Sequence, residues 1–321
     1  MDPHYPTEPS ERTKWILAQR PQRAQLDSAK PYAFFVEDEC SSIGEIVPVA
    51  TIFLTNRECP WRCVMCDLWK NTLTETVPPG AIPRQIAYAL ERLPAARQVK
   101  LYNSGSFFDP QAIPREDYAA IAKLVGHFDR TIVECHPALV GPPCFEFRDL
   151  LPHRLEVAIG LETAHPEVLE RLNKRMTLEL FASSAESLRA YGIDLRAFIL
   201  VQPPFMHPVE SLHWAQRSLD FAFDCGATAA SLIPTRGGNG AIEKLAHTGD
   251  FSPPRLTMLE SAVEYGIGLQ RGRVFSDLWD LRRTDPCCMQ CYPARIARLA
   301  EMNLQQQVLQ SIECAQCEAQ S

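Results

Sequence analysis

The segment Val49-Ala-Thr-Ile-Phe-Leu-Thr55 is followed closely by Cys59-Pro-Trp-Arg-Cys63-Val-Met-Cys66. The first part is an apolar run of strand length, and the second has the spacing C-x3-C-x2-C. Three thiolates on one short loop can bind three corners of a [4Fe–4S] cluster, which leaves the fourth iron without a protein ligand. Electron-transfer clusters usually have four protein ligands. An open iron can bind a small molecule, so the segment predicts a catalytic iron–sulfur loop at the end of a strand.

Composition limits the class of protein. The chain has 321 residues, 46% of them hydrophobic, which is enough for one large α/β domain with appendages. No apolar stretch approaches the roughly 18–20 residues of a membrane helix, and Met1 to Ser10 contains no signal-peptide core. We therefore expect a soluble, cytoplasmic protein with no membrane partner. The net charge of −7 disfavours a broad nucleic-acid surface. The basic segment 12–30 is either a local basic patch or, in the preferred interpretation, a solvated surface segment.

Strand-like and helix-like segments alternate from about residue 46. Strands are expected at 49–55, 98–102, 131–135, 155–161, 194–201 and 227–233. Helices are expected at 82–93, 115–127, 166–172, 177–191 and 209–225, with a short one at 142–150. Six such β/α units imply a parallel sheet with right-handed crossovers, and hence an α/β fold of the partial (β/α)6 TIM-like barrel type. Reactive groups would then gather on loops at the carboxyl ends of the strands.

Three regions are expected along the chain. An N-terminal extension, partly helical around 11–25, covers residues 1–45 and precedes the core at 46–240. A flexible Gly-rich loop at 235–240 ends the core. The remainder, 241–321, is expected to be a helical, Cys-rich tail that binds metal and covers the substrate.

At the cysteine loop the chain resembles the radical S-adenosylmethionine (SAM) superfamily. The family signature is C-x3-C-x2-C after the first strand of a partial barrel, and the resemblance covers about residues 46–240. It implies that Cys59, Cys63 and Cys66 bind a [4Fe–4S] cluster whose open iron is chelated by SAM. One electron then cleaves SAM reductively and generates a 5′-deoxyadenosyl radical. A zinc site or an electron-transfer cluster is the alternative for these cysteines.

Two SAM-binding elements follow the second and third strands in the resemblance. The stretch Tyr102-Asn-Ser-Gly-Ser-Phe-Phe-Asp109 stands where the family has a Gly-Gly-Glu-like stretch whose backbone binds the SAM amino group. The small residues Ser104, Gly105 and Ser106 allow close approach of a ligand to the backbone. Glu134 resembles the Glu-x-x-Pro element of Elongator-like and coproporphyrinogen-oxidase-like enzymes, and contacts SAM or substrate unless it forms a structural ion pair.

Further candidates come from later elements and from the cysteine loop itself. Glu162 resembles the ribose motif, because an ionised carboxylate accepts hydrogen bonds from hydroxyls. Lys174 or Arg175 would supply a cation to the SAM carboxylate, and the bidentate geometry of Arg favours Arg175. Gln202, just before Pro203, points toward substrate in this interpretation. Trp61 either lies against the adenine or shields the cluster from water.

A second group of cysteines lies in the tail. Cys288-x2-Cys291 and Cys314-x2-Cys317 can form a zinc site with four thiolates, or they can bind an auxiliary [4Fe–4S] cluster. Cys287 is a fifth candidate ligand. The paired spacing slightly favours zinc, and five metal-free thiols so close together would be vulnerable to oxidation.

Three functions compete at this stage. The first is a radical SAM enzyme acting on a small molecule or natural-product intermediate, with a flavodoxin- or ferredoxin-type electron donor. The second modifies a tRNA base, because the chain looks most like the branch that includes the radical SAM subunit of archaeosine synthase. The third is a non-catalytic iron–sulfur or zinc-binding protein. The acidic composition favours a small-molecule substrate over tRNA.

Overall fold

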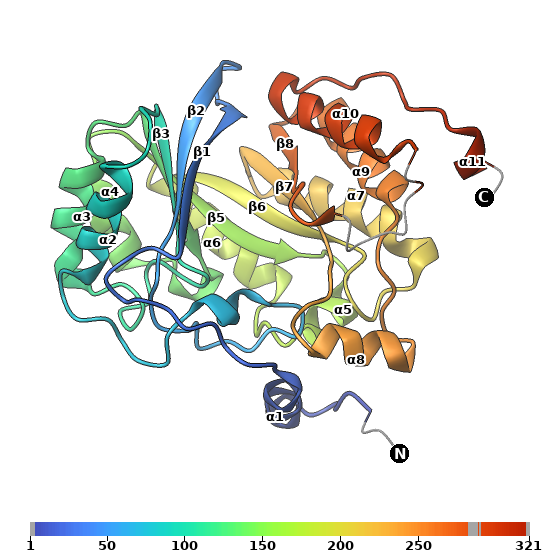
Figure 1. The fold of residues 1–321 in the computed structure, drawn as a ribbon, viewed down its shortest axis with the longest axis horizontal. Helices are drawn as coiled ribbons and strands as arrows, with labels where there is room; N and C mark the ends of the chain where they lie inside the picture. Colours follow the sequence, from blue (N-terminus) through green and yellow to red (C-terminus); the bar gives the residue numbers. More distant parts are fainter. Residues whose placement is uncertain (1–3, 282–287, 289, 319–321) are drawn as a thin grey trace.

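The computed structural model describes residues 4–281, 288 and 290–318, and its centre is one sheet that curls into a half-barrel (Figure 1). The strands follow one another across the sheet in chain order, from β1 to β8. The first pair is antiparallel and every later pair is parallel. The strands are β1 (Ala33–Cys40), β2 (Ile46–Phe53), β3 (Gln98–Tyr102), β4 (Arg130–Cys135), β5 (Arg154–Glu162), β6 (Asp194–Val201), β7 (Ala229–Pro234) and β8 (Arg273–Ser276).

Helices cover the outer face of the sheet and both ends of the half-barrel. The α-helices are α1 (Pro9–Gln19), α2 (Ala81–Leu90), α3 (Tyr118–Val125), α4 (Pro142–Leu150), α5 (Pro166–Arg171), α6 (Leu178–Ala190), α7 (Pro208–Asp224), α8 (Ala241–Thr248), α9 (Leu256–Gly268), α10 (Tyr292–Gln305) and α11 (Ala315–Glu318). Short 3-10 turns are η1 (Leu68–Asn71), η2 (Arg115–Asp117) and η3 (Pro137–Leu139). None of the described helices has the length and hydropathy needed to cross a bilayer.

The main hydrophobic core lies between the sheet and the helices that connect its strands. Strand residues such as Val99, Val157 and Ala197 are fully buried there against helix residues such as Ile86 and Leu188. Burying apolar side chains on the outer face of a parallel sheet is the expected driving force for this layered fold. The partial-barrel prediction is confirmed, and the bounds of β3 and β6 agree with the sequence-based ones.

Two edge strands were not predicted. The segment expected as an N-terminal extension contains β1, which pairs antiparallel with β2 over its full length. Its second half, Glu37-Asp-Glu39, lacks the apolar pattern of a core strand because its side chains pair with charges rather than with methyl groups. The tail contributes β8, whose four residues are too few to show a periodicity. Helix α10 contacts both of these edge strands, so it bridges the open side of the half-barrel.

Charged side chains fill the barrel interior near the amino-terminal ends of the strands. Glu156 is fully buried and binds three guanidinium groups, with distances of 2.6 Å to Arg196 Nε, 2.8 Å to Arg273 Nη2 and 3.1 Å to Arg130 Nη1. Arg196 also binds Glu39 at 2.5 Å. Although burial opposes ionisation, the three arginines lower the pKa of Glu156 to about 2. The network therefore stays ionised and connects β1, β4, β5, β6 and β8.

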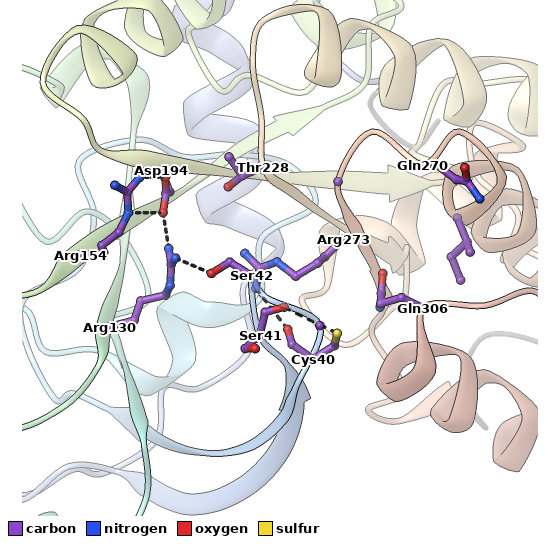
Figure 2. A pocket seen from close by; sticks show the side chains of 13 residues that line it. Cys40, Ser41, Ser42, Arg130, Arg154, Asp194, Thr228, Gln270, Arg273 and Gln306 are labelled. Carbon is purple, nitrogen blue, oxygen red and sulfur yellow. Dashed lines mark hydrogen bonds and ion pairs between the residues drawn. The ribbon is translucent and has the colours of Figure 1, made fainter.

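A cavity of about 580 Å³ opens below this network, at the end of the barrel where the strands begin. Figure 2 shows Asp194 between Arg154 and Arg130, and Arg130 reaching on to Ser42 in the turn between β1 and β2. Each guanidinium that lines the cavity has a protein partner, because Arg273 binds Glu156 and the Cys40 carbonyl. The cavity is therefore lined by guanidinium groups that are already paired with protein acceptors.

The network makes a prediction about stability. Replacing Arg196 with Met should lower the free energy of unfolding by about 3–5 kcal/mol, because Glu39 and Glu156 lose a buried partner. Arg154→Gln is the matched control, because Arg154 binds the same network through Asp194 from an exposed position, and it should cost at most about 1 kcal/mol. Denaturant unfolding of both variants measures the difference. Equal losses would show that the network contributes no more than a surface pair.

Candidate active site

The cysteine loop follows β2 at the carboxyl end of the strands and is fixed by backbone contacts. The fully buried Val64 donates its N–H to the Leu172 carbonyl at 2.9 Å. Asn239 donates from Nδ2 to the carbonyls of Val64 at 2.7 Å and Cys66 at 3.2 Å, and its Oδ1 accepts from the Ile242 N–H at the start of α8. The Gly-rich segment expected as a flexible loop thus binds the cysteine loop directly.

The N-terminal segment completes this support. Glu58, one residue before Cys59, binds Arg20 at 2.8 Å and Arg23 at 2.5 Å. Each of the five basic side chains of segment 12–30 forms an ion pair with a carboxylate. Helix α1 packs against α8, and Gly240 lies so close to α1 that an added Cβ would be 1.9 Å from the Gln19 carbonyl oxygen. These contacts fix the loop in one position.

The three cysteines of the loop are partly buried. Burial raises the pKa of Cys59 to about 11 and that of Cys66 to about 12, and raises the pKa of Cys63 as well. Three neighbouring thiolates would thus require a strongly cationic group, and a metal centre meets this requirement. Among the described residues, the only ligand group whose atoms all lie within 4.8 Å of one another is in the tail. The three loop thiols therefore do not all lie within this distance of one another, as expected if each bound a different iron of a cluster.

Lys174 is the cation whose charge acts most strongly on Cys59 and Cys63. Its Nζ forms an ion pair with Glu162 and donates to the Gly160 carbonyl at 2.6 Å. An added Cβ on Gly160 would lie 2.0 Å from Glu162 Oε1 and 2.1 Å from Lys174 Nζ, so only glycine leaves room for the pair. Although burial opposes it, Glu162 raises the pKa of Lys174.

The structure differs here from the sequence-based preference for Arg175. Arg175 is exposed, and it binds Asn173 Oδ1 at 3.2 Å and the Pro9 carbonyl at 2.9 Å. Asn173 and Arg175 both have positive φ angles, of 58° and 61°. These two turns of the backbone direct Lys174 inward and Arg175 outward. The bidentate geometry of Arg does not matter at a position whose side chain leaves the site.

Glu134 supports the loop after β3 from the neighbouring strand. Its Oε2 accepts the N–H groups of Asn103 at 2.8 Å and Ser104 at 3.0 Å. Gly105 follows, and an added Cβ there would lie 3.0 Å from the Cβ of Cys59. The Oγ of Ser106 accepts the His136 N–H at 3.4 Å. Glu134 thus supplies from β4 the carboxylate that the stretch after β3 lacks.

Trp61 lies face to face with His136, with ring centroids 3.6 Å apart and an interplanar angle of 9°. His136 Nδ1 accepts the Ala138 N–H, which leaves the Nε2 hydrogen to donate to the Lys174 carbonyl at 3.0 Å. Burial and the Lys174 charge lower the pKa of His136 to about 3. The ring is therefore neutral, and it fixes Trp61 and the backbone of Lys174 together.

Backbone strain is concentrated at this rim. Ser104, Glu162 and Gln202 end or follow β3, β5 and β6 with φ angles of 55°, 65° and 57°. Positive φ costs energy in residues with a side chain, and such residues cluster at functional sites. The sequence predicts all three as site residues, and the structure brings them to one end of the barrel.

Unpaired polar atoms lie at the same rim. Thr55, Asn103, Gln202 and Thr235 follow β2, β3, β6 and β7, and each has a buried side-chain oxygen without a hydrogen-bond partner among the described residues. Asn103 also lacks a partner for Nδ2. A buried unpaired polar atom costs roughly 1–3 kcal/mol. Because these unpaired atoms lie together at the carboxyl ends of the strands, they favour a polar ligand that supplies the missing hydrogen-bond partners.

The sequence reasoning missed several residues of this arrangement. Asn103, His136 and Asn239 were inside motifs that it quoted but were given no role. Thr55 ended a predicted strand and Thr235 began the predicted loop at 235–240, and their position at the carboxyl end of strands was the available signal. In the tail, the sulfur atoms of Cys288, Cys291 and Cys314 all lie within 4.8 Å of one another. Cys287 lies outside the described residues, and Cys317 is described only as part of α11.

The raised pKa of Glu134 predicts a pH dependence of the free energy of unfolding. Burial raises its pKa to about 7, against the opposing N–H donors and Lys174. The folded protein therefore retains a proton between about pH 4.5 and 7 that the unfolded chain has released. Across this window, the free energy of unfolding of the wild type should fall relative to that of Glu134→Gln. Above pH 7 the curves of unfolding free energy against pH should run parallel. Denaturant unfolding of the metal-free protein at several pH values tests this, and parallel curves throughout would contradict it.

The chain has relatives among known sequences, although no family model matches it. An uncharacterized protein of Methanocaldococcus jannaschii is 26% identical over 73% of this chain and 69% of its own length. Proteins named archaeosine synthase subunit beta are 26% identical in Methanosarcina acetivorans and 28% identical in Thermococcus kodakarensis. Those matches cover 64% and 67% of this chain, and 63% and 69% of the relatives.

Solved structures share parts of the fold. Elp3 of Methanocaldococcus infernus superposes with a TM-score of 0.48 at 13% identity over 60% of this chain and 51% of that one. Coproporphyrinogen III oxidase of Escherichia coli, a radical SAM enzyme, gives 0.46 at 12% identity over 82% and 56%. An HMG-CoA lyase of Bacillus subtilis gives 0.42 at 14% identity over 78% and 74%. Two of the relatives bear the name of archaeosine synthase, the branch that this sequence most resembles.

Proposed function

We propose that the chain is a radical SAM enzyme in which Cys59, Cys63 and Cys66 bind a [4Fe–4S] cluster. The observation that carries the proposal is the position of three partly buried thiols, which are not grouped as ligands of one ion, beside Lys174 and Glu162 at the carboxyl end of a partial barrel. When bound, the cluster supplies an electron and an open iron for reductive cleavage of SAM. A flavodoxin- or ferredoxin-type donor would reduce it.

The chain's own residues would bind and orient SAM. Lys174 offers a fixed cation to the SAM carboxylate, and its partner Glu162 offers an acceptor to the ribose hydroxyls. Glu134 fixes the backbone after β3, where Asn103 has unpaired polar atoms of both kinds. Gln202 presents an unpaired oxygen from the opposite part of the rim. These groups are pre-positioned by strained backbone, so little reorganisation is needed on binding.

The relatives change the preferred substrate. From the sequence, a small molecule was favoured over tRNA, but two relatives are named for archaeosine synthesis, which points toward a tRNA base. They are also named as a subunit, so a partner subunit is expected here. A partner that supplies RNA-binding surface would reconcile an RNA substrate with a net charge of −7.

Aromatic side chains in the barrel support a planar substrate. Tyr102 on β3 contacts Phe198 on β6 across the barrel with centroids 6.3 Å apart, and Phe53 lies 6.0 Å from Tyr102. Phe35 continues the series to Trp279, which is 58% exposed. Single-stranded or extruded bases are commonly stacked on such rings. We therefore propose a nucleobase in RNA as the substrate, with a small aromatic molecule as the alternative.

The central test measures SAM cleavage. Reconstituted wild type with a reductant should produce 5′-deoxyadenosine, and Cys63→Ala should lose this activity because the cluster loses a ligand. Cys225→Ser, outside both cysteine groups, should retain it. Adding bulk tRNA should then give a modified nucleoside, and RNA binding should weaken with salt. An intact cluster without SAM cleavage would contradict the enzyme, whereas cleavage without any RNA product or binding would favour the small-molecule alternative.

The assignment of the cation is tested separately. Lys174→Met should weaken SAM binding by about 10- to 100-fold, because one hydrogen bond to a charged group is lost. Arg175→Met should change it by less than about twofold, because Arg175 is exposed and faces Asn173 and Pro9. SAM titration of both variants at equal iron content distinguishes them. A larger loss in the Arg175 variant would reverse the assignment.

A further inference from the structure

The second cysteine group lies far from the first in the fold. Helices α10 and α11 lie at one end of the molecule, whereas α1 and α8, which flank the cysteine loop, lie at the other (Figure 1). This arrangement speaks against a direct part of these cysteines in the radical chemistry. It also differs from the expectation that the Cys-rich tail covers the substrate.

Three thiols converge where α10 begins. Cys288 and Cys291 form a turn in which the Tyr292 N–H donates to the Cys288 carbonyl at 3.1 Å, and Cys291 is the N-cap of α10. Cys314 comes from the tail, and its Sγ lies 3.7 Å from that of Cys288. The three sulfur atoms all lie within 4.8 Å of one another. A disulfide bond would be about 2.05 Å long and would use only two of them.

The spacing distinguishes between two kinds of metal centre. Thiolates on one tetrahedral zinc, with bonds of about 2.3 Å, lie about 3.8 Å apart. A cubane binds each thiolate to a different iron, so its thiolates lie further apart. The 3.7 Å separation of Cys288 and Cys314 matches a single ion. The loop at 59–66 shows the opposite, because its thiols form no such close group.

Charged neighbours suit a zinc–thiolate centre. Arg295 Nε donates to Cys291 Sγ at 3.3 Å, while its other nitrogens bind Glu260 on α9 and the Ile312 carbonyl. A cation beside the sulfur stabilises the excess negative charge of several thiolates on one divalent ion. Arg298 binds the Gln310 carbonyl at 2.7 Å, so two arginines fix the tail up to the residues just before Cys314.

We propose that Cys288, Cys291 and Cys314 bind one structural zinc ion that fastens the C-terminal chain to the start of α10. Zinc binding displaces the thiol protons, and Cys317, which completes the second C-x2-C pair, is the candidate fourth ligand from the sequence. Because α10 contacts both β1 and β8, the ion stabilises the helix that closes the open side of the half-barrel. The inference is independent of the radical chemistry.

Metal analysis of the anaerobically purified full chain tests the proposal. Wild type should contain about one zinc per chain, and Cys63→Ala should lose iron but retain the zinc. Cys291→Ser should lose most of the zinc, whereas the control Cys225→Ser should retain it. Iron and sulfide persisting in Cys63→Ala without zinc would establish a second cluster instead. A metal-free wild type with a disulfide between Cys288 and Cys314 would also overturn the proposal.

A second measurement covers the case in which Cys291→Ser does not fold. Glu313 is exposed in the tail next to Cys314, so a protease that cleaves after Glu reports how firmly this segment is fixed. Chelation of zinc from wild type, or Cys314→Ser, should accelerate cleavage there by about tenfold or more, because local opening becomes easier. Unchanged cleavage after complete zinc removal would contradict the fastening role.

Discussion

The ion pairs of the Glu156 carboxylate are the interactions on which the half-barrel depends most. The carboxylate lies fully buried on β5 and binds arginines from β4, β6 and β8. Arg196 extends the same network to Glu39 on the antiparallel edge strand. An open sheet of this size has two edges that must be brought into a curved arrangement, and these ion pairs connect both edges to the centre. Burying so many charges is favourable only if all are paired, which fixes the register of the strands that bear them.

The ion network lies at the end of the barrel where the strands begin, so a ligand can bind at the opposite end, where the parallel strands end. The strands that begin at the charged layer end at the rim with the cysteine loop, Lys174 and Glu162. Unlike the charged layer, this rim contains unpaired buried oxygens and positive φ angles. Such strain persists only where the surrounding structure over-determines it. The rigid end of the barrel therefore supports the strained end, and the strained end is where binding can repay the cost.

Patterns of several residues were predictable, whereas the direction of single side chains was not. The apolar runs of β3 and β6 have a periodicity that determines their bounds, and the spacing of Cys59, Cys63 and Cys66 predicts a loop that binds a cluster. β1 was missed because its acidic half is stabilised by partners on β3 and β6, distant in sequence. Lys174 and Arg175 are adjacent cations, and only the positive φ angles on either side of Lys174 decide which one faces the thiols.

Under the two proposals, cysteine groups with similar sequence spacings bind different metal centres. Both contain a C-x2-C pair, so ligand type and spacing alone left zinc and cluster open for the tail. The backbone of the cysteine loop is held by contacts of Val64 with Leu172 and of Val64 and Cys66 with Asn239. In the tail, Cys288 and Cys291 belong to a tight turn. Cys314 lies in the C-terminal segment, which Arg295 and Arg298 bind. The backbone that carries the ligands therefore determines whether they converge on one ion or surround a larger group.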